Sequence, residues 1–427
     1  MQNPCKIVFR SFINENHSKG GFRMYHSETD IEKLHLSFDR DNDCLTIRPA
    51  GRIESSNAME TETAIKPELH DISSVVLDCT DLEYISSAGL RIVLRIKKTY
   101  DDLKAVNVSS EVYDVFQVTG FSEMMDVEKA YRTLSVEGCE VIGQGANGIV
   151  YRYDEDTIVK VFRNPDALDE IKRERELART AFVLGVPTAI SYDIVKVEGG
   201  LYGSVFELLN ADTFQHLLIS GQKSVEEIVT MIVDLMKIVH STQPKSGALP
   251  SRLDIMRQRM PLIKPLLPED AFARLEQLVN TIPENGHMLH GDFHVKNVMI
   301  QNGESILIDM DTLCVGDPIF EFSGIYLPYV GFSELDPEDS MRFFNIPLET
   351  SHRLFYDSLR EYFKGCSLSF EEALIRTRIL AYSRLLFYCA IGKHTKPEEL
   401  EKRKAHAVKN LLELLPQTES LSADITY

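Results

Sequence analysis

The chain of 427 residues has few cysteines, no surplus of basic residues and no long apolar run. Its seven cysteines are scattered, odd in number and without a Cys-X-X-Cys pair, which disfavours a disulfide framework or a zinc site and indicates a reducing compartment. No apolar run reaches the length of a membrane span, and residues 5–9 are too few for the core of a signal peptide. We therefore expect a cytoplasmic protein without a membrane partner.

The charge balance is acidic, with a formal net charge of −19. Nothing in the sequence resembles the basic stripe of a nucleic-acid-binding protein, so nucleic acid is not expected as a ligand. The acidity is compatible with cationic substrates, but it is equally ordinary for a cytoplasmic protein. A hydrophobic content of 44% and a charged content of 26% are typical of soluble globular chains, and the length predicts two or three domains.

Residues 1–32 are polar and show no hydrophobic periodicity, and S-K-G-G at residues 18–21 is typical of flexible chain. We predict a flexible N-terminal extension here. Met24 offers an alternative start of the protein.

Short apolar strands alternate with amphipathic helices between residues 33 and 135. One apolar strand, residues 75–78, ends in an aspartate and leads through a loop to S-S-A-G-L at residues 86–90. The residues that follow, up to Tyr100, carry apolar side chains at helical spacing. The pattern predicts an α/β domain.

This strand–loop–helix element, together with V-T-G-F at residues 118–121, resembles the STAS domain, the fold of anti-sigma-factor antagonists. The resemblance implies a protein-binding module and places the serine that is phosphorylated in regulated members at Ser87. A phosphate at a helix N-terminus is stabilised by free N–H groups, and on a binding surface it repels a partner that fitted the hydroxyl. Ser86 stands where the family usually has aspartate. Alternatively, both serines only cap the helix.

The most informative stretch is H-G-D-F-H-V-K-N at residues 290–297, followed by Asp309. It resembles the catalytic loop of the protein-kinase-like superfamily, in the form typical of aminoglycoside phosphotransferase-like and choline kinase-like enzymes. The resemblance implies that Asp292 accepts or orients the proton of a substrate hydroxyl, and that Asn297 and Asp309 hold magnesium across the phosphates. The pattern of residues 298–308 predicts a hairpin, which would bring Asn297 and Asp309 to adjacent strand ends.

Upstream, residues 141–151 have the spacing G-x-G-x-x-G-x-V-Y, with glycines at Gly143, Gly145 and Gly148. Glycines let a backbone fold tightly over phosphates and offer N–H donors. Taken alone, the spacing would also fit a dinucleotide site, but such a site opens a helix. Here the chain continues as a strand, so a kinase-type glycine loop is predicted, with ATP as the bound nucleotide.

The next strand, residues 157–162, carries Lys160 between apolar residues. In the kinase-like reading Lys160 contacts the α- and β-phosphates and pairs with a glutamate of the following helix, residues 166–184. Glu174 and Glu176 are the candidates, and they face different sides of a helix. We prefer Glu174, because the apolar face of the helix lies near it.

The strand that ends at residue 207 runs into a hinge, where backbone groups of Glu207 and Leu209 are expected to bind adenine. Downstream of Asp309 there is neither Asp-Phe-Gly nor Ala-Pro-Glu, which resembles the phosphotransferase branch without a long activation loop. Asp311 either assists with metal or caps a turn, and Asp317 is expected to be structural.

We therefore predict two folded domains. An α/β STAS-like domain spans residues 33–135, and an α+β bilobal kinase-like domain spans residues 136–415. The second has a β-rich N-lobe at residues 136–209 and a helical C-lobe at residues 210–415. Residues 416–427 are expected to be a flexible tail.

The predicted function is ATP- and Mg²⁺-dependent phosphoryl transfer to a hydroxyl, of a small molecule in the first hypothesis. In the second, the acceptor is a protein serine, either Ser87 or a partner STAS domain in an anti-sigma-type pathway, because tethering raises effective concentration. In the third, the chain is a non-enzymatic interaction protein that only senses ATP.

Overall fold

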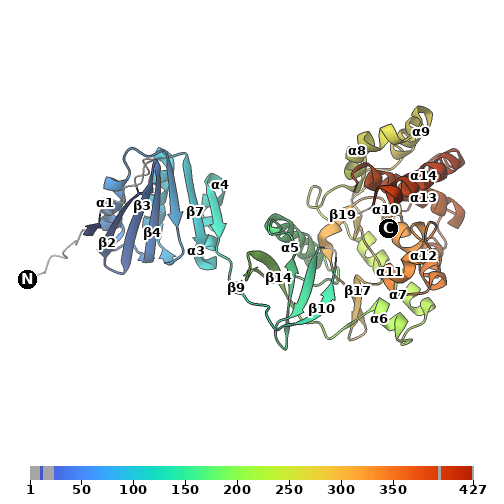
Figure 1. Ribbon diagram of the computed structural model, residues 1–427, viewed down its shortest axis with the longest axis horizontal. Coiled ribbons are helices and arrows are strands. Elements are labelled where there is room, and N and C mark those ends of the chain that lie inside the picture. The colour runs from blue at the N-terminus through green and yellow to red at the C-terminus, as the bar shows by residue number, and fades with distance from the viewer. Residues whose placement is uncertain (1–9, 13–23, 146, 393–395, 426–427) are drawn as a thin grey trace, which may run out of the picture. The chain divides into compact units, whose positions relative to one another are not determined.

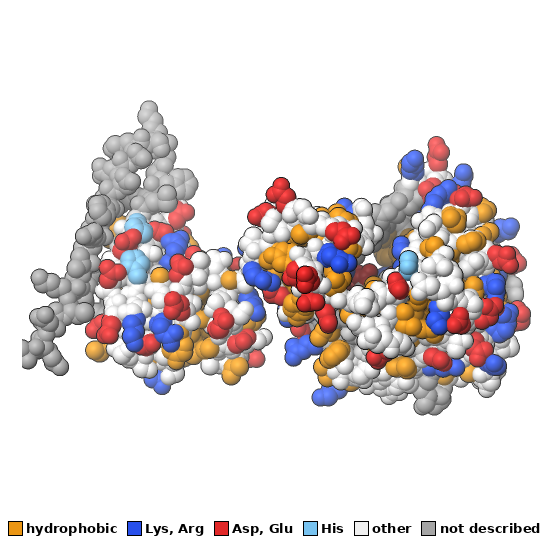
Figure 2. Space-filling view, turned by 90° about the horizontal axis from the view of Figure 1, so that it is seen from below, with side chains coloured by type: hydrophobic (Ala, Val, Ile, Leu, Met, Phe, Trp, Pro, Cys, Tyr) orange, Lys and Arg blue, Asp and Glu red, His pale blue; other side chains and the backbone are white. Residues whose placement is uncertain are grey.

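The computed structural model describes residues 10–12, 24–145, 147–392 and 396–425. The described residues fall into two compact units, Met1–Thr133 and Leu134–Tyr427 (Figure 1). Each unit has its own apolar core. On the face drawn in Figure 2, acidic and basic side chains are interspersed rather than gathered into a basic stripe. Among the described helices, none is both long and apolar enough to cross a bilayer.

The first unit is one mixed sheet with helices packed against it. The sheet runs in the order β1-β2-β3-β4-β5-β7-β8, with β6 paired to β4. β2 to β4 form an antiparallel meander, and the later strands add in parallel. Alternate side chains of β3 and β5 are buried, as expected for strands with one covered face. The strands are β1 (Arg10–Phe12), β2 (Met24–Ile31), β3 (Leu34–Asp41), β4 (Cys44–Ile53), β5 (Ser74–Asp78), β6 (Leu82–Ile85), β7 (Asp102–Val108) and β8 (Asp126–Lys129).

The helices of this unit are α1 (Ala58–Ile65), α2 (Ser87–Thr99), α3 (Ser110–Val118) and α4 (Phe121–Met124). α2 begins where Ser86 caps it, because the Ser86 hydroxyl accepts a hydrogen bond from the Gly89 N–H. Its apolar stripe, with Val93 and Ile96, is buried in the core. Gly89 is required by close packing, since a Cβ there would lie 2.6 Å from the Ile53 side chain.

The prediction of a flexible extension over residues 1–32 is wrong for residues 24–31; residues 1–9 and 13–23 lie outside the described part of the chain. β2 pairs with β3 along its whole length, from Met24 opposite Asp41 to Ile31 opposite Leu34. The inward side chains of β2 include Ser27 and Thr29, which are buried, and the Ser27 hydroxyl donates to Glu68. Because these inward residues are polar, the strand lacks the alternation of apolar residues from which a strand is predicted. Residues 18–21 lie outside the described part of the chain.

The N-lobe of the second unit is an antiparallel sheet with one long helix, α5 (Leu168–Val183). The strand order is β10-β11-β12-β14-β13-β9. Valines of β12, β13 and β14 form its core. The strands are β9 (Thr133–Leu134), β10 (Glu140–Gln144), β11 (Gly148–Arg152), β12 (Thr157–Phe162), β13 (Asp193–Val197) and β14 (Leu201–Glu207).

The C-lobe is helical and carries two small sheets. Its helices are α6 (Phe214–Ile219), α7 (Val225–Ser241), α8 (Arg252–Ile263), α9 (Glu269–Val279), α10 (Ile319–Tyr326), α11 (Asp339–Phe344), α12 (Leu348–Tyr362), α13 (Phe370–Ala390) and α14 (Pro397–Leu414). Its strands are β15 (Asp212–Thr213), β16 (Met288–Leu289), β17 (Val298–Gln301), β18 (Glu304–Leu307) and β19 (Cys314–Val315). The hairpin β17–β18 turns through Asn302 and Gly303, both at positive φ, as two-residue hairpin turns require.

The end of the chain also differs from expectation. Residues 416–427 were predicted to be a flexible tail, but Leu421 and Ala423 are fully buried. The Ala423 N–H donates to both carboxylate oxygens of Asp317 at 3.0 Å, and Arg376 pairs with Asp424 at 2.8 Å. Asp317 is thus structural. Polar contacts hold the tail in place. Its amino-acid composition is therefore as polar as that of a flexible terminus, which is why the sequence predicted one. Residues 426 and 427 lie outside the described range.

Candidate active site

The glycine loop joins β10 to β11 at the edge of the N-lobe sheet. The Gly145 N–H donates to the Gly148 carbonyl at 3.0 Å and closes the turn. Gly148 is required by close approach, because a Cβ there would lie 2.5 Å from the Val161 carbonyl oxygen. Gly145 has open space where a Cβ would stand, and Gly143 has only ordinary contacts. The backbone at Gly145 is therefore accessible to a ligand; residue 146 is outside the described chain.

Lys160 lies on a central strand of the same sheet, opposite Val150 on one side and Ser204 on the other. Its Nζ is 2.9 and 3.1 Å from the two carboxylate oxygens of Glu174 and 2.8 Å from Asp309 Oδ1. Glu176, the alternative partner, is exposed and lies 4.0 Å from Arg179. The helix α5 therefore presents Glu174, and not Glu176, to the lysine.

Burial shapes the charge states of this pair. Burial lowers the pKa of Lys160, but the carboxylates of Glu174 and Asp309 outweigh it and raise that pKa above its usual value. Burial also raises the pKa of Glu174, against the pull of Lys160. The lysine therefore stays cationic, as a phosphate contact requires.

Asp292 lies in the H-G-D loop beside His294 and Asn297. Burial disfavours its charged form, but the positive charges of His294 and Arg384 hold the pKa of Asp292 well below its ordinary value. The Asn297 amide nitrogen donates to the Asp292 carbonyl at 3.0 Å and lies 3.4 Å from its carboxylate. Asp292 is thus an ionised acceptor that can orient a hydroxyl donor.

The loop is held by a carboxylate that the motif analysis missed. Glu321 of α10 is fully buried and accepts hydrogen bonds from the N–H groups of His290, at 2.7 Å, and Gly291, at 2.9 Å. His290 Nδ1 accepts from the Asp292 N–H, so its Nε2 carries the proton and donates to the Ile308 carbonyl. The only signal for Glu321 in the sequence is a charged residue within an otherwise apolar helix.

The backbone geometry explains why the middle residue of H-G-D, Gly291, is glycine. Gly291 has a φ of +85°, and a Cβ there would lie 2.6 Å from the Thr312 carbonyl oxygen. A larger residue would both strain the backbone and push away the turn Met310–Thr312 that follows Asp309. The loop therefore packs directly against the segment with the metal-binding candidate.

Asn297 and Asp309 flank the β17–β18 hairpin, as the sequence predicted, and the Ile308 N–H donates to the Asn297 carbonyl at 3.0 Å. Asp309 has a φ of +64°, an uncommon conformation for a residue with a side chain. Such strain is characteristic of functional positions. Since the amide nitrogen of Asn297 bonds Asp292, its Oδ1 is the atom left to accept or to bind a cation.

Asp311 adds a further carboxylate. Burial, together with the charges of Asp309 and Glu174, raises the pKa of Asp311 to about 7. Asn147 of the glycine loop lies 3.4 Å from its carboxylate. Three acidic groups thus face one lysine, and this excess negative charge favours a hard cation with oxygen ligands. Within the described chain no three His, Cys, Asp or Glu side chains form a metal cage, and the donors fit Mg²⁺, which takes few protein ligands beside phosphates.

The hinge follows β14. The Leu208 N–H donates to the Asp156 carbonyl at 2.7 Å, toward β12. Because successive backbone groups of an extended chain point to opposite sides, those of Glu207 and Leu209 are directed away from β12. This is the arrangement expected for backbone recognition of a base.

These parts define a kinase-like phosphotransferase built from a glycine loop, a paired lysine and an H-G-D loop. Comparisons with known proteins agree. A model of the phosphotransferase enzyme family matches residues 138–354, and a STAS domain model matches residues 35–135. The chain belongs to the phosphotransferase enzyme family and carries a STAS domain. Both resemblances, the fold class and the enzyme class are thereby confirmed.

Among curated proteins, the putative anti-sigma factor antagonist BtrV of Bordetella bronchiseptica is 30% identical over 99 residues, covering 22% of this chain and 85% of that protein. Among solved structures, ADP-bound aminoglycoside phosphotransferase APH(2'')-Ib aligns with 17% identity and a TM-score of 0.44, over 65% of this chain and 93% of that one. A thermostable mutant of APH(4)-Ia, without ligand, aligns with 14% identity and a TM-score of 0.46, over 66% and 97%.

Proposed function

We propose that this chain transfers the γ-phosphoryl group of ATP, with Mg²⁺, to a hydroxyl of a small molecule. The observation that carries the proposal is the Nζ of Lys160 between Glu174 and Asp309, 2.9 and 2.8 Å away. Asp292 and Asn297 belong to the loop that contacts the same segment. Phosphoryl transfer needs this combination of a phosphate cradle, a cation site and a placed hydroxyl.

Each residue has one task in this proposal. The backbone of Gly143, Gly145 and Gly148 covers the phosphates, and Lys160 neutralises the α- and β-phosphates. Backbone groups of Glu207 and Leu209 bind the base. Asn297 and Asp309 would hold Mg²⁺, which would neutralise charge on the phosphates. Asp292 accepts the hydrogen bond of the attacking hydroxyl.

The short connection after Asp309 supports a small acceptor. Between Asp309 and the start of α10 at Ile319, the chain forms only the turn Met310–Thr312 and the two-residue strand β19. No element between them resembles a long segment on which a peptide substrate could be aligned.

The test is ADP formation by purified protein with Mg²⁺ and a panel of hydroxyl compounds, compared with Asp292→Asn. This substitution retains the size of the side chain and removes the ionised acceptor. We expect ADP release coupled to acceptor phosphorylation in the wild type and at least a hundredfold loss in the variant. Equal rates for the two proteins would refute the assignment of Asp292.

A second acceptor is supported by one observation in the first unit. Ser86 is buried and caps α2, whereas Ser87, the first residue of the helix, is exposed. The Ser87 hydroxyl is therefore not needed for capping, and a phosphate there would be stabilised by the helix N-terminus. We propose Ser87 as a phosphorylation site that controls a protein partner of the STAS domain.

Mass spectrometry of the peptide spanning residues 78–91, after incubation with ATP and Mg²⁺, tests this second proposal. Phosphate on Ser87 that is lost in Asp292→Asn would establish self-modification. An unmodified Ser87 with a demonstrably active enzyme would leave the small molecule as the acceptor. We place the protein in the cytoplasm, in line with free cysteines at all six described positions.

A further inference from the structure

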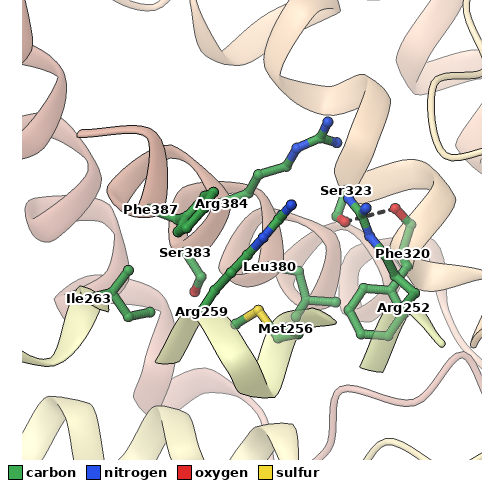
Figure 3. A pocket seen from close by; sticks show the side chains of 10 residues that line it. All are labelled: Arg252, Met256, Arg259, Ile263, Phe320, Ser323, Leu380, Ser383, Arg384 and Phe387. Atoms are coloured by element: carbon green, nitrogen blue, oxygen red, sulfur yellow. Dashed lines mark hydrogen bonds between the residues drawn. The ribbon is translucent and has the colours of Figure 1, made fainter. Parts of the chain in front are cut away.

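Three arginines surround a small cavity between helices of the C-lobe, called here the arginine pocket (Figure 3). Arg252 and Arg259 come from α8, and Arg384 comes from α13. Residues spaced by three and four share one face of a helix, so each helix turns one such face to the cavity. The other lining residues are Met256, Ile263, Phe320, Ser323, Leu380, Ser383 and Phe387.

The positive charges of this pocket have no carboxylate as a direct ion-pair partner among the described residues; Glu321 and Asp292 act on Arg252 and Arg384 only at longer range. In the part of the chain that the structure describes, none of the three arginines forms an ion pair with an Asp or Glu. Arg384 Nε donates to the Tyr388 hydroxyl at 2.7 Å, and its Nη1 is buried without a hydrogen-bond partner. Arg259 lies over the Phe387 ring at 4.4 Å, and Arg252, with 9% of its surface exposed, makes no hydrogen bond to a described residue.

Arg257 shows the ordinary arrangement on the same helix. It is exposed and pairs with Asp254 at 3.4 Å and Glu284 at 3.1 Å. A buried charge without a partner is costly. Arg252 is buried, Arg259 and Arg384 are half-buried, and three positive charges in one place repel one another. Burial, reinforced by the charge of Arg252, lowers the pKa of Arg259 to about 10, and burial together with Arg384 lowers that of Arg252. In a chain of net charge −19, a concentration of unpaired positive charge requires an explanation.

The pocket lies directly behind the catalytic loop. A Cβ built at Gly324 of α10 would be 3.1 Å from both Arg384 Nη1 and the Gly291 carbonyl oxygen, so these two atoms flank Gly324. The charge of Arg384 also contributes to the low pKa of Asp292. On the other side, Arg252 packs against Gly316, where a Cβ would be 3.0 Å from the Arg252 Cβ. The positive charge is therefore close to the place of the reacting hydroxyl.

We propose that the arginine pocket binds an anionic group, phosphate or carboxylate, of the acceptor molecule. The proposal rests on the proposed phosphotransferase function and names the substrate class: a hydroxyl compound that carries negative charge, rather than an amino sugar or other polycation. Guanidinium groups suit this task because their planar N–H pattern matches phosphate and carboxylate oxygens. The cavity measures about 20 Å³, room for one group of the size of a water molecule. A single oxygen of the phosphate or carboxylate therefore enters it, and the rest of that group stays outside with the body of the acceptor.

Anion binding can be measured without catalysis. The melting temperature of the full-length protein is followed during titration with inorganic phosphate, and separately with acetate. Saturating AMP-PNP and Mg²⁺ are present, so that the nucleotide site is filled. A ligand that binds only the folded chain raises the melting temperature in a saturable way. Sodium chloride at equal ionic strength serves as the reference.

Arg252→Gln and Arg259→Gln are the test variants, and Arg257→Gln is the matched control from the same helix. We expect each test variant to bind the preferred anion at least about tenfold more weakly, as loss of a charge-assisted hydrogen bond implies. Arg257→Gln should bind as the wild type does. Because the substitutions relieve repulsion, the variants should fold, and circular dichroism checks this. Arg259→Lys, which retains the charge, should recover part of the affinity.

Tighter binding of phosphate identifies a phosphorylated acceptor, and tighter binding of acetate identifies a carboxylated one. Unchanged anion affinity in both test variants, or no saturable response in the wild type, would overturn the proposal. Asp292→Asn should bind the anion at least as tightly as the wild type does, because it removes a negative charge that acts on Arg384. Anion binding with no phosphoryl transfer to any acceptor would therefore refute the proposed function and leave the anion site standing.

Discussion

Lys160 and the arginine pocket are both partly buried cationic sites, but their surroundings have opposite charge balance. Lys160 faces Glu174, Asp309 and Asp311, so that acidic groups exceed the cation. In the arginine pocket the cations have no carboxylate partner among the described residues. The sign of the excess charge at each site favours a ligand of the opposite charge. On this basis we propose a divalent cation with phosphates at the first site and an anion at the second.

The comparison is tested most strongly at Lys160. Lys160→Ala removes the cation on which Glu174 and Asp309 converge, and turnover should fall by about 10³-fold, as for the loss of a transition-state charge contact. Single-turnover measurement of ADP formation checks this. Lys196→Ala, on an exposed position of β13, is the control and should retain wild-type turnover. Near wild-type activity of Lys160→Ala would remove Lys160 from the phosphate site.

A substitution at Glu321 tests the positioning of the catalytic loop, and not the charge balance at Lys160. Glu321→Gln leaves a buried side chain that no longer offers two carboxylate oxygens to the N–H groups of His290 and Gly291. We expect the free energy of unfolding to fall by about 2 kcal/mol. We also expect kcat to fall about tenfold, with little change in the KM for ATP, because Asp292 is misplaced while the nucleotide contacts persist. Urea unfolding and steady-state kinetics measure the two effects, and an unchanged kcat would contradict the positioning role.

The pH dependence of stability probes the acidic excess. The pKa of Asp311 is raised by burial from an ordinary 3.8 to about 7, so the folded chain binds this proton more tightly than the unfolded chain. Its contribution to stability is therefore complete below the unfolded pKa and is lost as pH rises toward 7. Between pH 4 and 7, melting temperature should decline more, or rise less, in the wild type than in Asp311→Asn.

Addition of Mg²⁺ with AMP-PNP should reduce this difference between wild type and Asp311→Asn, because a bound cation favours the ionised carboxylate. Identical pH profiles for the two proteins, with and without the ligands, would show that Asp311 does not titrate in this range.

The smallest effect concerns the arginine pocket without a ligand. Arg259→Gln removes one of three mutually repelling charges and should raise the melting temperature by up to about 2 °C. Arg257→Gln removes exposed ion pairs with Asp254 and Glu284 and should lower it slightly or leave it unchanged. Differential scanning calorimetry in buffer without phosphate or carboxylate resolves the two signs. A clear fall for Arg259→Gln would indicate a stabilising contact in place of repulsion.

The sequence by itself determined the parts whose meaning lies in short-range spacing. The glycine loop, Lys160, the H-G-D loop and the β17–β18 hairpin are contiguous patterns, because each performs its task within one turn or one pair of strands. The spacing of Glu174 and Glu176 also predicted that only one of them could face the lysine, since residues two apart lie on different sides of a helix.

Only the tertiary structure decided what depends on distant segments. Strand β2 and the chain end were missed because their inward contacts are polar, through Ser27 and Asp317, and a polar segment resembles a free one. Glu321 and the arginine pocket have no local pattern that names their partners, because these partners come from separate helices and loops. The acceptor class that we propose depends on these groups, because charge balance is a property of side chains that meet in space, and they are far apart along the chain.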